Sequence, residues 1–421
     1  MRRFLSWLTG TRESRAEQGP PQPELDSPAR GNTRFTLDLY AQLKDCVGPY
    51  ENVACSPFGV SLALATIHAG ARGQTEDHLA RVLRSTTDDD PWQTTLAGLR
   101  ERLIAGAKND DCVLGLANSL WAPTGLPLRN EFSETVGRSY GADVKQADFS
   151  HEEPARTLIN QWLRETTRQL FDAVVARGEI TPDTRLVSIN ALCFKGYWTT
   201  PFGAQQTLDE PFWVNPHTKT IVPMMWQRGT FPYGQFPFHF ADRVQVIELP
   251  YAGVEFSMVL LLPEGLEGII ELEHTLGRQK GKLDPWLSAL CPREIDVALP
   301  KFTVGSRFHL GDTLIGMGVT DAFSREDADF SGMRGERDLW LSHAFHQALV
   351  AIDEFGATDD AAASGGDSPT RETGRTTPRP VPMFRADHPF LFLIRQRASG
   401  QILFMGRVMV PTIAQKFTPV L

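Results

Sequence analysis

The chain has 421 residues, of which 41% are hydrophobic and 22% charged, so it can bury a large core without covalent staples. Its formal net charge is −9, from 42 basic and 51 acidic residues, which argues against general nucleic-acid binding because that needs a basic surface. The longest aliphatic run, Met258–Leu262, is far shorter than the ~20 residues that span a bilayer, so we expect no membrane-spanning helix.

The N-terminal stretch 1–31 predicts a disordered leader, because residues 19–30 are rich in proline. Its apolar run, Phe4–Leu8, is interrupted by Ser6 and is too short for a clear signal peptide. Apolar spacing and capping residues then predict helices over 33–47, from Ser56 to Ile67, from Thr75 and over 91–107, followed by a strand over 113–122, a helix over 153–171 and a buried strand over 186–198.

The second half of the chain reads mainly as strands. Short strand-like runs separated by Pro and Gly fill 210–263, and a helix is expected at 307–317. Two strands, 390–395 and 401–410, are joined by a turn at 398–400. Because helices and strands are mixed without a regular alternation, the pattern predicts an α+β fold rather than a doubly wound sheet. A short tail, 413–421, follows.

No pattern in the sequence supports catalysis or metal binding. The five cysteines are scattered without a CxxC motif and are expected to be buried free thiols: Cys46, Cys55, Cys112, Cys193 and Cys291. His343 and His346 lie three residues apart, but no HExxH motif or carboxylate pattern surrounds them. We therefore expect no metal, no cofactor and no catalytic residues, and the protein is not expected to be an enzyme.

One segment near the C-terminus stands apart in composition. Of the 20 residues from Ser364 to Met383, 13 are Gly, Pro, Ser or Thr, and three are arginines. Strand-like sequence flanks the segment, and only 38 residues follow it, which is too few for a second domain. This predicts a long exposed loop within one domain, and such loops are usually functional.

Several blocks of sequence together resemble the serpin family of serine protease inhibitors and their non-inhibitory relatives, from about Phe35 to Pro411. These blocks are Asn52–Pro57 with Ala69–Thr75, Ile189–Trp198, Leu299–Phe302 with Met317–Phe323, Phe384–Phe390 and Ile402–Val408. The resemblance implies one domain, 32–412, with three β-sheets and eight or nine helices. It also identifies the long segment, about 355–383, as the reactive-centre loop that is offered to a protease.

The resemblance implies a suicide-substrate mechanism and a serine protease as partner, with the protein itself a monomer. The protease cleaves the loop and forms an acyl-enzyme, and the freed loop then inserts as a new strand into the largest sheet. By position, Ser56, Asn190 and His346 correspond to the polar cluster where that sheet parts, and Trp198 to the aromatic residue at the top of the opening. The plain alternative is that they are satisfied core residues. Gln347 stands where the family usually has Lys.

The hinge at the start of the loop departs from the inhibitory pattern, which continues in small residues after the hinge glutamate. In a strand, neighbouring side chains face opposite ways, so one of two adjacent aspartates would face the sheet's packed side in any register. A desolvated carboxylate is costly unless it is paired, whereas alanines favour insertion. The hinge residues are Glu354, Gly356, Ala357, Asp359, Asp360, Ala361 and Ala362.

Family spacing gives three candidates for the residue before the cleaved bond. Counting from Glu354 reaches Thr370, next to Arg371, and counting back from Pro389 reaches Arg375. Arg371 is favoured, then Arg375, then Thr370, and either arginine would suit a trypsin-like protease. The plain alternative is that the arginines keep the loop soluble. Residues 91–108 carry too few basic side chains to predict a heparin site.

Two functions therefore compete at this point. The first is inhibition of a trypsin-like serine protease by loop insertion. The second is a non-inhibitory serpin with a binding, storage or chaperone role, which the two aspartates of the hinge favour. The resemblance implies an extracellular location, whereas the lack of a clear signal peptide leaves a cytoplasmic one open.

Overall fold

The computed structural model describes residues 28–83, 96–101, 112–239, 242–357 and 381–413. Within them the helices are α1 (Pro28–Asp45), α2 (Pro57–His68), α3 (Gly73–Leu83), α5 (Asn130–Tyr140), α6 (Glu152–Thr166), α7 (Gly268–Arg278), α8 (Leu283–Ser288), α9 (Gly311–Gly316) and α10 (Ser331–Arg334). Residues 96–101 are also helical. Short 3₁₀ turns occur at η1 (Ala204–Gln206), η2 (Lys280–Lys282) and η3 (Asp321–Phe323).

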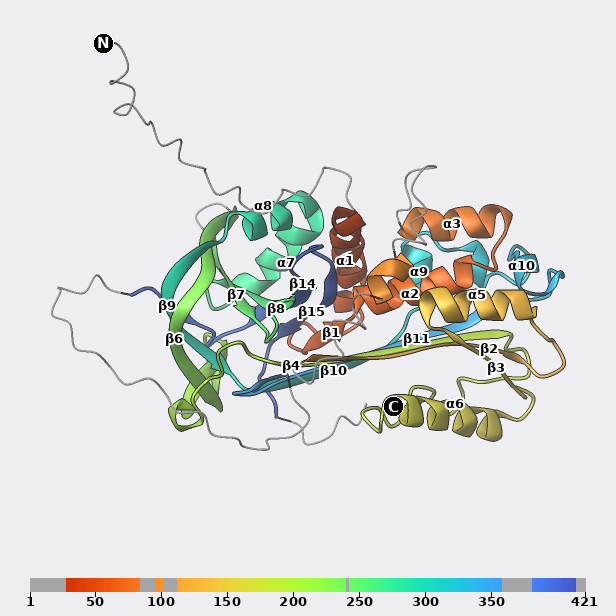
Figure 1. Ribbon diagram of the computed structural model, residues 1–421, viewed down its shortest axis with the longest axis horizontal. Helices are drawn as coiled ribbons and strands as arrows, with labels where there is room; N and C mark the ends of the chain where they lie inside the picture. Colours follow the sequence, from red (N-terminus) through yellow and green to blue (C-terminus); the bar gives the residue numbers. More distant parts are fainter. Residues whose placement is uncertain (1–27, 84–95, 102–111, 240–241, 358–380, 414–421) are drawn as a thin grey trace, which may run out of the picture.

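The strands of a six-stranded sheet run along the long axis of the molecule (Figure 1). Its order is β10 (Phe302–His309), β11 (Leu341–Ile352), β4 (Leu186–Tyr197), β2 (Cys112–Pro123) and β3 (Asp143–Ala147), and the two-residue β12 (Gly356–Ala357) pairs with the end of β4. The two central strands, β11 and β4, run parallel, and each pairs antiparallel with its other long neighbour.

The second sheet has nine strands in two arms that share β6 (Thr218–His239). One arm combines β6 with β5 (Leu208–Asn215), β9 (Cys291–Pro300) and β13 (Met383–Arg385). The other continues through β7 (Asp242–Pro250), β8 (Phe256–Pro263), β14 (Phe390–Gln396), β15 (Ile402–Val408) and β1 (Val53–Cys55). With the six-stranded sheet, these arms account for the three expected sheets.

The two faces of the six-stranded sheet are covered differently (Figure 1). Helix α6 packs on one face over a smaller core that includes Trp121, Ile159 and Trp162. The other face meets the larger core, in which every residue of α2 is buried. Inserting a strand into this sheet would therefore disturb two separate cores.

Most of the predicted elements occur, and the deviations have local causes. Ser56 caps α2 as expected, because its side chain accepts a hydrogen bond from the Gly59 amide. The helix predicted over 153–171 ends at Thr166, because Arg168 and Gln169 have positive φ angles of 51° and 67°. The helix predicted over 307–317 is wrong in its first residues, since β10 extends to His309 and α9 begins at Gly311.

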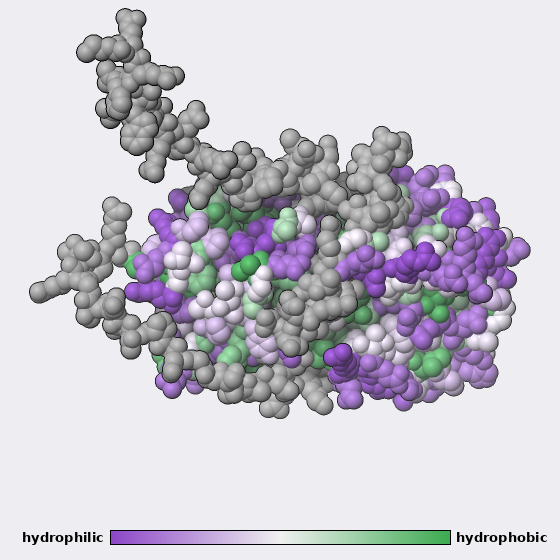
Figure 2. Space-filling model, viewed as in Figure 1, coloured by the Kyte–Doolittle hydropathy of each residue, from purple (hydrophilic) through white to green (hydrophobic). Residues whose placement is uncertain are grey.

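The prediction that the cysteines are buried holds only in part. Cys55 and Cys193 are buried, whereas Cys46 and Cys291 are exposed, and all four are free thiols. The helices in the described ranges include none long and apolar enough to cross a membrane. Figure 2 shows hydrophilic residues dominating the viewed face, with apolar residues interspersed among them.

Candidate functional site: the seam between β4 and β11

The seam is the boundary between the parallel strands β4 and β11, where the resemblance places the opening of the sheet. The two strands pair from Leu341 opposite Leu186 to Val350 opposite Phe194, with one irregularity between Leu341 and His343. Opening the seam would break this ladder and expose its side chains on both faces. Contacts that cross the seam therefore resist opening.

Ser56, Asn190 and His346 meet at the centre of the seam, as their predicted grouping requires. His346 on β11 and Asn190 on β4 are direct strand partners, and His346 Nδ1 lies 2.9 Å from Asn190 Oδ1. The Ser56 amide donates to His346 Nε2 at 2.9 Å, and the Ser56 hydroxyl donates to the Leu403 carbonyl at 2.6 Å. All three residues are fully buried. Their role in opening the sheet stays a prediction.

These contacts fix the state of the imidazole. Because the Ser56 amide can only donate, His346 Nε2 must accept, and Nδ1 therefore carries the proton donated to Asn190. Burial lowers the pKa of His346 to about 3, so the ring is neutral at pH 7. The neighbouring Gly59 has no room for a side chain, since a Cβ would lie 2.5 Å from Asn190 Oδ1.

Trp198 lies just beyond the C-terminal end of β4. We call this the upper end of the seam, and the end at which β4 and β11 begin the lower end. Its ring stacks on Tyr251 with a centroid distance of 4.6 Å and an interplanar angle of 7°. Its indole Nε1 donates to the Asp353 carbonyl at 3.1 Å, and its amide donates to the Phe355 carbonyl at 2.7 Å. Trp198 thus holds the chain at the point where the reactive-centre loop begins.

The first hinge residues are bound to the body of the protein. Glu354 forms an ion pair with Lys301 at 2.7 Å and accepts a hydrogen bond from Thr207 at 2.8 Å. Burial raises the pKa of Glu354, but the bonds from Lys301 and Thr207 outweigh it, so the pKa lies below its ordinary value.

The short strand β12 continues directly from this glutamate. Gly356 and Ala357 pair antiparallel with Tyr197 and Gly196 of β4. Since β2 occupies the other edge of β4 at Gly196, β12 lies on the side facing β11. Gly356 has φ of 136°, which favours glycine, and a Cβ there would lie 2.0 Å from the Gly196 carbonyl oxygen.

The remaining predicted site residues lie outside the part of the chain that the structure describes. They are the hinge residues Asp359, Asp360, Ala361 and Ala362 and the candidate bait residues Thr370, Arg371 and Arg375. Their assignments stay predictions.

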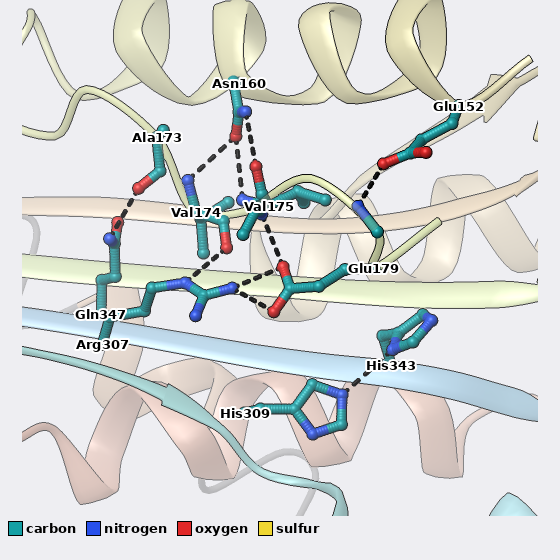
Figure 3. Close-up of polar contacts among 12 residues, drawn as sticks. Glu152, Asn160, Ala173, Val174, Val175, Glu179, Arg307, His309, His343 and Gln347 are labelled. Carbon is teal, nitrogen blue, oxygen red and sulfur yellow. Dashed lines mark hydrogen bonds and ion pairs between the residues drawn. The ribbon is translucent and has the colours of Figure 1, made fainter. Parts of the chain in front are cut away.

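A segment that sequence reasoning missed crosses the seam on the face covered by α6. We call residues 167–185, which join α6 to β4, the connector. Asn160 of α6 accepts from the amides of Val174 and Val175 at 2.9 and 3.0 Å and donates to the Val175 carbonyl at 2.9 Å (Figure 3). Gln347 of β11 donates to the Ala173 carbonyl at 2.8 Å.

Arg307 of β10 holds the connector more strongly. Its Nε donates to the Val174 carbonyl at 2.7 Å, and its Nη2 lies 2.6 Å from both carboxylate oxygens of Glu179 (Figure 3). The guanidinium also lies 5.1 Å from the Phe345 ring centroid. The connector is thereby tied to β10 and β11 on one side of the seam while it continues into β4 on the other.

The lower end of the seam is closed by contacts at the starts of β4 and β11. The Leu186 amide donates to the Trp340 carbonyl at 3.0 Å, and the Arg185 amide donates to Ser342 Oγ at 2.9 Å. The Arg185 guanidinium lies 4.8 Å from the Trp340 ring centroid. These contacts close the end of the seam opposite Trp198.

Sequence comparison identifies the family to which this architecture belongs. The family model described as "Serpin (serine protease inhibitor)" matches residues 30–411. The chain is a serpin. It is therefore related to protease inhibitors rather than to enzymes, as the sequence predicted.

Relatives and solved structures agree with this assignment. The leukocyte elastase inhibitor of Homo sapiens is 36% identical over 398 residues, which cover 92% of this serpin and 100% of the relative, and that of Xenopus tropicalis is 35% identical over 90% and 98%. Serpin48 of Tenebrio molitor matches with a TM-score of 0.80 at 28% identity, over 93% of this chain and all of that one. Human thyroxine-binding globulin also matches at 0.80, with 27% identity over 92% and 99%.

Proposed function

We propose that this serpin inhibits a serine protease as a suicide substrate, with the cleaved loop entering the seam between β4 and β11. The observation that carries this proposal is β12. An inserted strand must run antiparallel to both β4 and β11, and Gly356 and Ala357 already pair with β4 in that direction, on the side of the seam. Insertion would extend a pairing that exists before cleavage.

Continuing this register assigns a partner to each hinge residue. Asp359 falls opposite Phe194, and Asp360 falls opposite Cys193. Directly opposed residues share a face of the sheet, and Phe194 belongs to the larger core whereas Cys193 belongs to the smaller core under α6. Asp359 is therefore the carboxylate that would enter the larger core.

The surroundings of the two aspartates would differ in the inserted strand. Phe194 packs edge-on against Tyr251, Phe256 and Phe404, so Asp359 would face aromatic rings. Asp360 would lie diagonally across from Lys195, on the same face as Cys193, where an ion pair is within reach. Protonating an aspartate to bury it costs about 4 kcal/mol at pH 7, from its ordinary pKa of about 3.9.

The proposal also concerns the class of serine protease that is inhibited. Arg371 and Arg375 favour a trypsin-like enzyme, whose pocket carries a carboxylate. Both relatives reported above, however, are named leukocyte elastase inhibitors, and the small side chain of Thr370 would suit the small pocket of an elastase. We keep Arg371 as the first candidate and treat Thr370 as the elastase alternative.

The test is incubation with trypsin and, separately, with an elastase, followed by a denaturing gel and mass spectrometry of the released fragment. We expect a covalent band at the summed masses and loss of protease activity. A C-terminal fragment that begins at Glu372, Thr376 or Arg371 would place the cleaved bond after Arg371, Arg375 or Thr370. Cleavage that leaves all of the protease active would overturn the inhibitory proposal.

The alternative is a serpin that binds rather than inhibits, and Asp359 is the observation that favours it. Thyroxine-binding globulin, in complex with thyroxine, shares this fold, so the fold alone admits a binding role. The Asp359→Ala variant separates the two functions. If slow insertion limits the protein, the variant forms the covalent complex more efficiently, and Asp360→Ala, the matched control, changes it little. If neither variant forms a complex, the binding role is favoured.

A further inference from the structure

A pair of histidines outside the seam cluster lies at the lower end of the six-stranded sheet. His309 ends β10 and His343 lies near the start of β11, and His309 Nε2 is 3.0 Å from His343 Nδ1 (Figure 3). His343 is not grouped with His346, its neighbour in the sequence. His346 faces Ser56 in the buried seam cluster, whereas His343 borders a surface cavity.

The cavity gives both rings access to a small ligand. It has a volume of about 350 Å³, and both histidines line it together with Asp312 and Ser342. The two rings are held in place by Phe345, which stacks on His343 at 5.6 Å and meets His309 edge-on at 5.0 Å.

We propose that His309 and His343 form a binding site for a divalent transition-metal ion, with water completing the coordination. Two nitrogens about 2.1 Å from one metal ion lie about 3.0 Å apart at a right angle and about 3.4 Å apart in a tetrahedron. The observed 3.0 Å is the length of the hydrogen bond that the two rings make without an ion, and it is close to the spacing of a metal-bound pair, so a small rotation of the rings would let both nitrogens bind one ion. Imidazole ligands suit Ni²⁺, Cu²⁺ and Zn²⁺. To bind the ion as a neutral ligand, the ring that now donates the hydrogen bond carries its proton on its other nitrogen instead, so that both facing nitrogens offer a lone pair.

The charges around the pair are compatible with a cation. Arg307 acts electrostatically on His309, but Glu179 pairs with it through two contacts of 2.6 Å. Asp312 lines the same cavity, and its negative charge offsets that of the ion. Among the described residues, no three His, Cys, Asp or Glu side chains could hold a metal ion together, so this is a site with two protein ligands.

The test is titration of the full-length chain with NiCl₂ by isothermal calorimetry at pH 7.5. We expect one saturable site in the unmodified chain and no saturable site in His309→Ala or in His343→Ala, because each variant keeps only one of the two ligands. His217→Ala, which removes an exposed histidine of the β5–β6 turn, is the control and leaves that site unchanged. The exposed thiols of Cys46 and Cys291 compete for nickel, so each titration is repeated with both changed to Ser.

The outcomes separate cleanly. Absence of a saturable site in the unmodified chain overturns the proposal, and so does equal affinity in His309→Ala. Should the alanine variants unfold, His309→Asn and His343→Asn keep a polar side chain, and circular dichroism verifies the fold before titration. No protease enters this experiment, so its result is independent of the inhibitory proposal.

Discussion

The contact between Arg307 and the connector makes a prediction that joins stability to inhibition. Arg307→Met keeps the length of the side chain but removes the hydrogen bond to Val174 and the paired contacts to Glu179. Because the connector crosses the seam, we expect the native protein to become less stable and the sheet to open more readily. Arg307→Met should therefore lower the stability of the native protein but raise the efficiency of inhibition.

The expected loss in the free energy of unfolding follows from the burial of the Arg307–Glu179 pair. The side chains of Arg307 and Glu179 are 15% and 24% exposed, so solvent screens the pair only in part. Hydrogen bonds to charged groups contribute about 1.5–3 kcal/mol when buried, and after discounting for this exposure we expect a total loss of about 2 kcal/mol. If the contact is broken before the transition state of insertion, the same energy speeds insertion about 30-fold.

Two measurements test this reasoning. Thermal unfolding of the uncleaved variant is expected at a temperature lower by a few degrees. Titration of the protease is expected to need fewer inhibitor molecules per protease inactivated, because faster insertion wins more often against hydrolysis of the acyl-enzyme.

The control is Arg228→Met, which breaks a pair of similar geometry, 2.6 Å to both oxygens of Asp296, between β6 and β9 and away from the seam. We expect Arg228→Met to leave the titration unchanged. The reasoning is refuted if Arg307→Met lowers the unfolding temperature and the inhibitor requirement stays that of the unmodified protein.

Three further predictions concern the seam and the hinge. His346→Phe leaves the Ser56 amide and Asn190 without their partner, so urea unfolding should show a loss of about 2–5 kcal/mol. The pKa of His346 is about 3 in the folded protein and about 6.5 in the unfolded chain, so the free energy of unfolding falls as pH drops below 6.5, by about 2 kcal/mol at pH 5. Unfolding of His346→Gln, measured at pH 7 and at pH 5, should lack this loss. Gly356→Ala forces a Cβ against the Gly196 carbonyl, so hydrogen exchange should show loss of the β12 pairing, and unchanged protection of the Ala357 amide would contradict this.

The sequence predicted the residues at the centre of the seam better than the residues that hold the connector across it. Ser56 and Asn190 are identifiable because each lies in a recognisable block, and His346 is identifiable by its position relative to the blocks. Ser56 also carries a local capping signal that the structure repeats. Asn160 and Arg307 carry no such signal. They contact the connector through side chains, and the partners of Arg307 lie more than 120 residues away along the chain.

Two elements that were not predicted correctly, β10 and α5, nevertheless have a clear pattern in the sequence. In β10, the buried residues Phe302, Val304, Ser306 and Phe308 alternate with more exposed ones, which is the period of a strand, so a helix over 307–317 conflicted with the pattern there. In α5, Phe132, Val136 and Tyr140 recur every four residues, which is a helical signal that was not used. Exposure of Cys46 and Cys291 depends on tertiary packing and has no counterpart in local sequence.

The energetics of the seam predict that the hinge aspartate would affect the rate of loop insertion more than its final extent. Insertion breaks one ladder, the nine residue pairs between β4 and β11, and builds two, so the net change is about one additional ladder. At roughly 1 kcal/mol for each net hydrogen bond, that gain exceeds the cost of about 4 kcal/mol for burying Asp359. In the proposed insertion, however, Asp359 would enter at the top of the seam, two residues beyond β12, so its cost would be incurred before most of the new ladder forms.

Cleavage in the loop should therefore raise the unfolding temperature even when no covalent complex forms, because insertion remains favourable after the protease has left. The cleaved protein is expected to unfold at a higher temperature than the intact one, and incubation after cleavage at pH 5.5 should complete the change faster than at pH 7, since protonating Asp359 then costs about 2 kcal/mol less. Asp359→Ala should remove this dependence on pH. A cleaved protein with the unfolding temperature of the intact one would show that the seam does not accept the loop, and the binding role would then be the better account of this serpin.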